Sequence, residues 1–226
     1  MSIWKRISNL IVENTLQARN GVILDHKRYQ AIKVGFNKPV YTWRDIIGNV
    51  QPKASGAGSP TRAAYAGATL GQYSFAANDV CDFEWHIPHD YVPGTDLFFH
   101  VHWSHSGTTT TGNAVFDVYY TYAKGHNQAA FPAEKNLTIT YATTDVATTP
   151  QYRHRVDELA MTARTATTTL TANSVIEIDG VILGTLKLTT LPTLGGGGKL
   201  FIHTCDIHYQ SSNIGTIGKA PDFYQV

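Results

Sequence analysis

His100 and His102 stand one residue apart in an apolar stretch of this 226-residue chain, and their type and spacing suit metal chemistry. On a β-strand, side chains at positions i and i+2 project from the same face of the sheet. Two neutral imidazoles placed in this way can bind zinc, iron, manganese or nickel. The pair is therefore the candidate metal site, and the alternative is a half-buried structural pair that hydrogen-bonds across the sheet.

The segment around this pair resembles the opening of the cupin metal motif, because Gly94 precedes His-x-His by five residues. Cupins have a jelly-roll-like fold, so the resemblance implies a cupin-like metal-dependent enzyme that uses His100 and His102. The glutamate that should follow is missing from residues 103–109, and the second cupin motif is absent. Catalytic metals usually have three protein ligands. A third could come from His105, Asp117, His203 or His208.

A second polar cluster lies in the segment 201–209. Period-two alternation predicts that His203 and Cys205 share one face of a strand, while Asp206 and His208 share the other. A Cys–His pair can support nucleophilic chemistry, but apolar neighbours favour an inert core thiol for Cys205. We therefore predict no catalytic residue, no cofactor and no metal, and His100 and His102 remain the only metal-ligand candidates.

The elements that must position these residues are strands, because apolar and polar residues alternate with a period of two over most of the chain after residue 80. Glycine- and proline-rich turns separate the segments. Strands of 7–10 residues joined by loops imply an antiparallel β-sandwich or barrel, and about eight of them favour a jelly-roll-like, all-β fold. The predicted strands are 80–87, 97–105, 114–122, 137–142, 174–178, 181–191 and 200–209.

The domain organisation follows from the same patterns. Residues 1–40 form a predicted N-terminal arm that is part helical, since apolar residues between Ile3 and Leu16 recur with helical spacing. Residues 41–226 form the predicted β-sandwich domain. Within it, residues 48–60 are rich in glycine, proline and serine and predict a flexible loop. The stretch 162–171 is predicted to be an edge strand or an exposed loop.

Composition narrows the classes of partner. The formal net charge is +1, which argues against nucleic acid as the main partner, because phosphate binding needs a concentrated basic face. No apolar run reaches the roughly 18 residues that span a bilayer, and the N-terminus does not read as a signal peptide, so we expect no membrane partner and folding in a cytoplasm. Only 15% of residues are charged, and 12 Tyr and 4 Trp offer interface anchors, which favours contacts with other proteins.

Three blocks of sequence carry a second resemblance. They are Trp43-Arg44-Asp45-Ile46, then Pro88-His89-x-Tyr91-x-x-Gly94-Thr95-Asp96-Leu97-x-x-His100-Val101-His102-Trp103, then Asp206-Ile207-His208-Tyr209 followed by Gly215-Thr216. Their order resembles a set of uncharacterised proteins encoded among the virion genes of tailed bacteriophages.

That resemblance implies a β-sandwich component of a phage particle: a tail-associated, connector or capsid-decorating protein. It implies a homo-oligomer that contacts other phage structural proteins in the virion, after synthesis in the cytoplasm of the bacterial host. It names no catalytic residue. An arm such as residues 1–40 can lock subunits together, because its ordering entropy is lost only on docking.

Two alternatives to a structural virion component remain open. One is a carbohydrate- or receptor-binding module on the particle, with a host-surface glycan as partner, since aromatic rings stack on pyranose faces. An exposed Trp or Tyr in a concave groove would favour this alternative. The other is the cupin-like enzyme, which a third ligand beside His100 and His102 would favour.

Overall fold

The computed structural model describes residues 22–23, 33–34, 41–67, 69–141, 150–161, 176–212, 215–216, 218–221 and 223. Contacts divide the chain into two units, Met1–Val40 and Tyr41–Val226. In the first unit, β1 (Val22–Ile23) pairs antiparallel with β2 (Lys33–Val34). The helix predicted between Ile3 and Leu16 lies outside the described residues, and the role of this unit as an arm stays a prediction.

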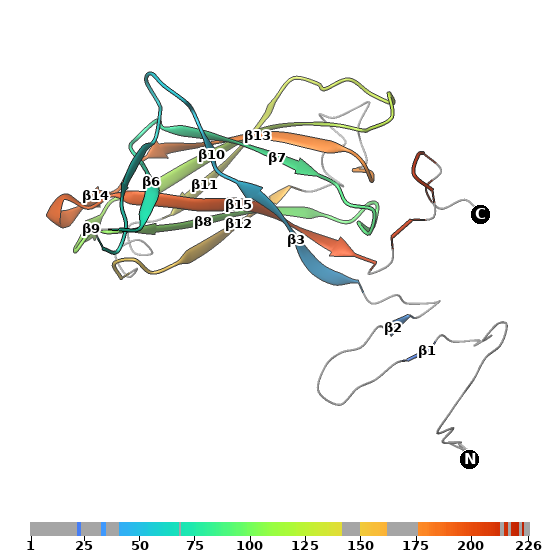
Figure 1. The fold of residues 1–226 in the computed structure, drawn as a ribbon, viewed down its shortest axis with the longest axis horizontal. Coiled ribbons are helices and arrows are strands. Elements are labelled where there is room, and N and C mark those ends of the chain that lie inside the picture. The colour runs from blue at the N-terminus through green and yellow to red at the C-terminus, as the bar shows by residue number, and fades with distance from the viewer. Residues whose placement is uncertain are drawn as a thin grey trace, which may run out of the picture. The chain divides into compact units, whose positions relative to one another are not determined.

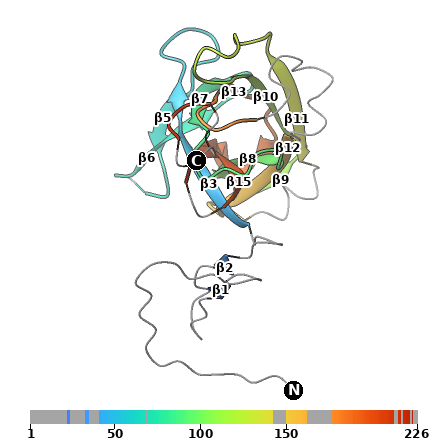
Figure 2. The ribbon, with the colours of Figure 1, turned by 90° about the vertical axis from the view of Figure 1, so that its right-hand side faces the viewer.

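The second unit is an all-β, antiparallel β-sandwich with a jelly-roll-like arrangement, as the strand pattern predicts (Figure 1). Its two layers are seen end-on in Figure 2, with β7, β13 and β10 in one layer and β3, β15 and β8 in the other. The five-stranded sheet has the order β11 (Lys135–Tyr141), β10 (Ala114–Ala123), β13 (Val181–Thr190), β7 (Val80–His86) and β4 (Gln51–Pro52).

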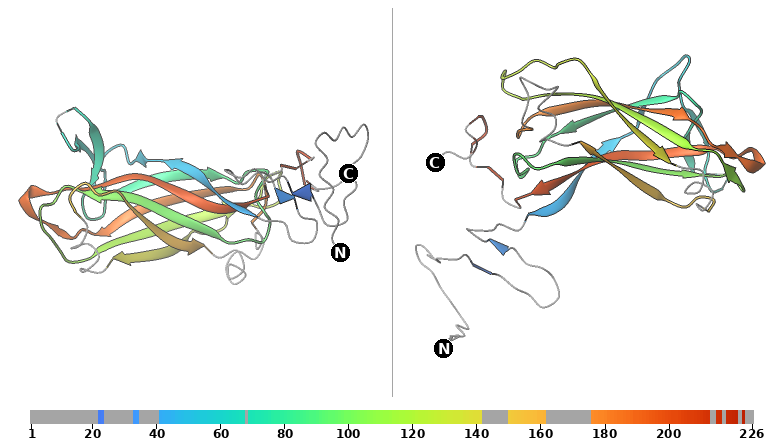
Figure 3. Two further views of the ribbon diagram at one scale, coloured as in Figure 1. Left: turned by 90° about the horizontal axis from the view of Figure 1, so that it is seen from below. Right: turned by 180° about the vertical axis from the view of Figure 1, so that it is seen from behind.

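The six-stranded sheet has the order β12 (Arg155–Met161), β8 (Leu97–His105), β15 (Leu200–Ser211), β6 (Gly71–Phe75) and β5 (Thr61–Ala64), and β3 (Thr42–Asn49) also pairs with β15. β15 is the longest strand of this sheet, and it contacts β8 on one side and β6, then β3, on the other. A short pair, β9 (Thr110–Thr111) with β14 (Thr193–Leu194), closes one end of the sandwich (Figure 3).

The strands with clean alternation match their predicted ranges closely, because one face of each contacts the interior. The prediction of a strand over 174–178 is wrong for residues 176–178, which the structure describes. Ile176 and Ile178 are buried, but they lead into a turn at Asp179 and form no strand. The stretch 162–171 lies outside the described residues. Several described strands have no prediction. Among them, β5 and β6 are short, and β12 mixes charged with apolar residues without a clear period of two.

The loop predicted over 48–60 is also wrong in part. Gly48 and Asn49 are the last two residues of β3 in the six-stranded sheet, and Gln51–Pro52 forms β4 at the edge of the five-stranded sheet, so the chain crosses between layers at Val50. An edge strand accepts a proline because its N–H side can lack a ladder partner. The residues that follow are bonded to β7, with Val80 N donating to Gly58 O at 2.9 Å.

The interior is filled by large side chains from both sheets, and Trp85 of β7 is among the largest that are fully buried. Its indole Nε1 donates to the carbonyl oxygen of Cys205 in the opposite sheet at 3.0 Å. The indole also stacks on Phe83, with ring centroids 5.4 Å apart and an interplanar angle of 12°. Two glycines make room for it: a Cβ on Gly48 or Gly184 would meet Trp85 atoms at 2.5 Å or 2.6 Å.

We expect the substitution Gly184→Ala to destabilise the domain by about 1–3 kcal/mol, because the new methyl group would overpack the interior against Trp85. Gly215→Ala is the matched control, since among the described residues a Cβ there meets His89 Cβ alone, at 3.9 Å. The control should lie within about 0.5 kcal/mol of the original chain. Urea unfolding midpoints measure both, and equal midpoints for the two variants would disprove the packing role of Gly184.

Candidate functional sites on the two sheet faces

His100 and His102 project from the outer face of the six-stranded sheet. Alternate residues of β8 between them and beside them, Phe99, Val101 and Trp103, are fully buried in the sandwich interior. The two histidines therefore cannot form a metal site in the sandwich interior, where the apolar side chains of β8 lie instead. Although it faces outward, His100 is only 6% exposed, because polar side chains of neighbouring strands surround it.

Strand register brings those neighbours together. Asp206 of β15 lies opposite His100, and His208 of β15 lies opposite Asp45 of β3. One ligand-type atom from each of Asp45, His100, Asp206 and His208 lies within 4.8 Å of the others. We call these four residues the His–Asp cluster. All four belong to the three sequence blocks described above, which therefore meet on the adjacent strands β3, β15 and β8.

The His–Asp cluster is bounded by further polar contacts. His100 Nε2 is 2.9 Å from Glu158 Oε2 on β12, and the rings of His100 and His208 have centroids 3.6 Å apart. His208 Nε2 also contacts Asp45 Oδ1. Burial raises the pKa of Asp206, an effect that His102 and His100 oppose, and burial lowers the pKa of His208. The cluster therefore combines a carboxylate that is costly to ionise with an imidazole that favours its neutral form.

The polar contacts continue along β8. His102 Nδ1 is 2.8 Å from His154 Nε2. Further along the strand, Ser104 Oγ is 2.9 Å from His203 Nε2 and 2.9 Å from the hydroxyl of Tyr65. From His100 to Ser104, the outer face of β8 is thus a row of hydrogen-bonding side chains.

The prediction that His203 shares a face with Cys205 is wrong. The register of β15 against β8 shifts between Ile202 and Thr204, so His203 is the extra residue of a β-bulge. The bulge lets His203 point to the outer face while Cys205 stays in the interior. Burial raises the pKa of the Cys205 thiol, which makes it a poor nucleophile, as the sequence predicts.

The candidates for a third ligand therefore separate in space. His208 lies in the His–Asp cluster. His203 lies further along the same face beside Ser104. His105 is buried on the interior face of β8, and Asp117 belongs to the other sheet. Sequence reasoning placed Asp206 and His208 on one face of a strand but missed the contribution of Asp45 and Glu158, since only strand pairing brings these positions together.

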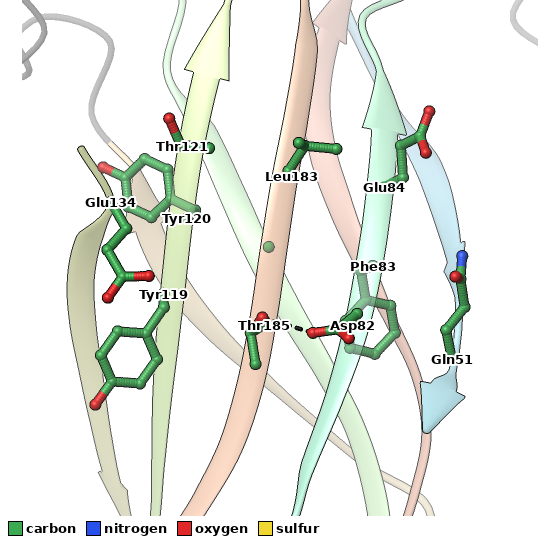
Figure 4. Close-up of a pocket in the computed structure, with 11 residues that line it drawn as sticks. Gln51, Asp82, Phe83, Glu84, Tyr119, Tyr120, Thr121, Glu134, Leu183 and Thr185 are labelled. Carbon is green, nitrogen blue, oxygen red and sulfur yellow. Dashed lines mark hydrogen bonds between the residues drawn. The ribbon is translucent and has the colours of Figure 1, made fainter. Parts of the chain in front are cut away.

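Another feature that sequence reasoning missed is a groove of about 330 Å³ on the outer face of the five-stranded sheet. It crosses the strands, from Gln51 on β4 to Glu134 just before β11 (Figure 4). Figure 4 shows Tyr119 and Glu134 on one flank, and Gln51 and Glu84 on the other. The side chains that line the groove from this face are Gln51, Asp82, Glu84, Tyr119, Thr121, Glu134, Leu183 and Thr185. We call it the polar groove.

Hydroxyl groups donate hydrogen bonds to the carboxylates in and beside the polar groove. Thr185 Oγ1 donates to Asp82 Oδ1 at 2.6 Å in the middle of the groove. Beside it, the nearly buried carboxylate of Asp117 accepts hydrogen bonds from Thr138 of β11 at 2.6 Å and Thr189 of β13 at 2.8 Å. The Tyr119 hydroxyl reaches the same carboxylate at 3.4 Å. Asp117 therefore holds three strands in register beneath the aromatic ring.

Comparison with known proteins finds no matching family model and no matching curated protein. Solved structures with similar folds include dimeric latent PorU from Porphyromonas gingivalis, with 9% identity and a TM-score of 0.33 over 76% of this chain, which spans 13% of that protein. A CBM35 from Cellvibrio japonicus Abf62 has 12% identity and a TM-score of 0.31, with 75% of this chain and 98% of that chain covered.

A third similar structure is a Xyl-CBM35 in complex with a glucuronic acid containing disaccharide, with 13% identity, a TM-score of 0.30, and 74% and 93% of the two chains covered. In the part of the chain that the structure describes, no helix is both long and apolar enough to cross a membrane.

His203 makes the stability of the domain depend on pH. Burial, with the nearby charges of His154 and His102, lowers the pKa of His203 from 6.5 to about 4. Between pH 6.5 and about 4, the imidazole of His203 therefore binds a proton in the unfolded chain but stays neutral in the folded chain. The contribution of His203 to stability falls as the pH drops through this range. We expect His203→Gln to lose less stability than the original chain over this window.

Chemical unfolding at pH 7.5, 5.5 and 4 tests this expectation. Both proteins carry a neutral side chain at position 203 at pH 7.5, so that measurement sets the baseline, and the amide of Gln can still bond to Ser104 Oγ. The same loss of stability in both proteins between pH 6.5 and 4 would contradict a buried neutral imidazole at His203.

Proposed function

We propose that this protein is a carbohydrate-binding module that holds a neutral glycan in the polar groove of the five-stranded sheet. The observation that carries the proposal is the position of Tyr119, an outward-facing aromatic ring set in a groove of hydrogen-bonding side chains. A sugar ring presents an apolar C–H face and a rim of hydroxyl groups. An aromatic ring beside carboxylate, amide and hydroxyl groups matches both parts.

The hydrogen-bonding groups of the groove suit sugar hydroxyls. Carboxylates are strong acceptors for hydroxyl donors, and charge-assisted hydrogen bonds are roughly twice as strong as neutral ones. Gln51 adds an amide that both donates and accepts. Because these side chains stand on paired strands and Asp82 is already held by Thr185, a ligand loses little affinity to the ordering of the site.

Charge selects among glycans. Three carboxylates, those of Asp82, Glu84 and Glu134, line the polar groove, and the residues that line it include no Lys or Arg. Anionic sugars would meet like charges with no cation to offset them. The groove therefore favours neutral sugars over uronic acids, and its course across the strands suits a chain of several sugar units.

We expect a panel of neutral hexasaccharides to include a ligand with a Kd of roughly 0.1–1 mM, or about 4–5.5 kcal/mol, while uronic acid oligomers of the same length do not bind. Tyr119→Ala should weaken that binding roughly 3- to 10-fold, since aromatic contacts contribute about 0.5–1.5 kcal/mol beyond area. Isothermal titration calorimetry measures both, and chromatography of the recovered oligosaccharide should find it uncleaved.

Trp43→Ala is the matched control, because Trp43 is a 52% exposed aromatic on the other sheet. It should leave glycan affinity unchanged. Weaker glycan binding in Trp43→Ala together with full binding in Tyr119→Ala would place the glycan site on the six-stranded sheet. That result would overturn the assignment of the polar groove.

The second candidate function is a component of a tailed-phage particle, which the three sequence blocks imply. The three blocks lie on the adjacent strands β3, β15 and β8. This placement supports the view that the resemblance reflects one shared structural unit. The two functions are compatible, since a particle protein can carry a glycan-binding face.

Deleting residues 1–40 tests the particle function, because an arm that orders on a neighbour stabilises assembly without being needed for the β-domain to fold. We expect the full chain to form higher-order assemblies by light scattering or on phage particles. The 41–226 chain should show the circular dichroism spectrum of a folded β-domain and assemble less. Assembly of the truncated chain equal to that of the full chain would remove the arm from this hypothesis.

A further inference from the structure

We propose that the His–Asp cluster of Asp45, His100, Asp206 and His208 is a binding site for one divalent first-row transition cation, with Zn²⁺ as the best-fitting ion. This site is on the outer face of the six-stranded sheet, while the polar groove is on the outer face of the five-stranded sheet. The inference therefore stands apart from the glycan-binding function, and each can fail without the other.

The donor set selects the class of ion. Two imidazoles and two carboxylates offer mixed nitrogen and oxygen ligands, which suit zinc and its neighbours better than calcium or magnesium. Four protein ligands are the number of a closed, tetrahedral zinc site. Ligands about 2.0–2.2 Å from a tetrahedral ion lie about 3.4 Å from one another. The four ligand atoms already lie within 4.8 Å of one another, so side-chain rotation can bring them to this spacing.

The hydrogen bond to Glu158 prepares His100 as a ligand. A carboxylate only accepts hydrogen bonds, so His100 Nε2 is the atom that carries the proton in the 2.9 Å contact with Glu158 Oε2. In the neutral ring, Nδ1 then holds the lone pair, and Nδ1 is the nitrogen that faces Asp206, 3.9 Å from Oδ2. A carboxylate behind a metal-binding histidine fixes the tautomer in this way at many metal sites.

An independent observation comes from Asp206 itself. This carboxylate is only 4% exposed, and its Oδ1 has no well-aligned hydrogen bond among the described residues. His102 Nε2 lies 2.7 Å from this oxygen as an ion-pair neighbour, although neither atom makes a regular hydrogen bond among the described residues. Buried carboxylates are normally paired or bound to metals. Among the described residues, the ion-pair neighbours of Asp206 are the imidazoles of His102 and His100, so a bound cation would complete the pairing of this carboxylate.

The geometry also says what a bound ion would do. Asp45 belongs to β3, His100 to β8, and Asp206 and His208 to β15. Among the described strands, β3 pairs with β15 alone in this sheet. An ion in the cluster would join three strands and hold β3 against the sandwich, so its binding should raise the midpoint of thermal unfolding.

The test uses the full-length chain, stripped of metal with a chelator. Isothermal titration calorimetry with Zn²⁺ should give one site per chain, with much weaker binding of Mg²⁺ and Ca²⁺. Co²⁺ should give the ligand-field absorption of a low-symmetry site with nitrogen and oxygen ligands. Zn²⁺ should raise the unfolding midpoint of the original chain.

Asp45→Asn and His208→Gln are the informative variants, because these ligands are the less buried pair and the new side chains are close in size. Each should weaken Zn²⁺ binding by at least about tenfold, since even residues behind the ligands cost about 10- to 100-fold. His126→Gln is the matched control, because His126 contacts Asp179 elsewhere in the domain. It should bind Zn²⁺ as the original chain does, and so should Tyr119→Ala.

Three outcomes would overturn the proposal. They are the absence of Zn²⁺ and Co²⁺ binding to the stripped chain, full affinity in both ligand variants, and loss of affinity in His126→Gln alone, which would place the ion at Asp179. Circular dichroism spectra like that of the original chain establish that each variant is folded.

Discussion

The indole of Trp85 is the interaction on which the rest of this domain depends. It fills the space left by Gly48 on one sheet and Gly184 on the other, and its N–H bonds to the Cys205 carbonyl. A buried N–H without a partner costs free energy. This hydrogen bond therefore favours one spacing and one alignment of β15 relative to β7 in the opposite sheet. Asp206 follows Cys205, and Thr185 follows Gly184. The same side chain therefore sets the position of the His–Asp cluster on one outer face and of the polar groove on the other.

The two outer faces use polar groups in opposite ways. On the five-stranded sheet, the Asp117 carboxylate is satisfied by threonine hydroxyls of two neighbouring strands, which leaves Tyr119 and the groove carboxylates to face a ligand. On the six-stranded sheet, the polar groups crowd together and bury Asp206 behind histidines. Carboxylates that stay in contact with water can bond to sugar hydroxyls, whereas a buried carboxylate needs hydrogen-bond donors, as Asp117 has, or a positive partner. One sandwich thus presents two surfaces with different ligand chemistry.

Local irregularities give these faces their chemistry. The bulge at His203 turns one more imidazole to the outer face and keeps Cys205 inside, where it meets Trp85. The crossing of the chain at Val50 places β3 on one sheet and β4 on the other, so a single connection supplies Asp45 to the cluster and Gln51 to the groove. Bulges and sheet-switching segments commonly re-aim side chains in this way.

The sequence by itself determined the all-β class, the long strands and which residues of a strand share a face, because alternation with a period of two separates the two sides of a strand. It also singled out His100 and His102 and the inert thiol of Cys205. It could not place His203, since a one-residue bulge reverses the alternation without a local signal, and it missed β12, whose charged residues hide the pattern. Only the tertiary structure decided that Asp45, Glu158 and Asp206 surround His100. It also decided that side chains as far apart in the chain as Gln51 and Thr185 line one groove. The physical reason is that strand order and register are set by contacts between segments far apart in the chain, and these contacts leave no periodic mark on any one segment.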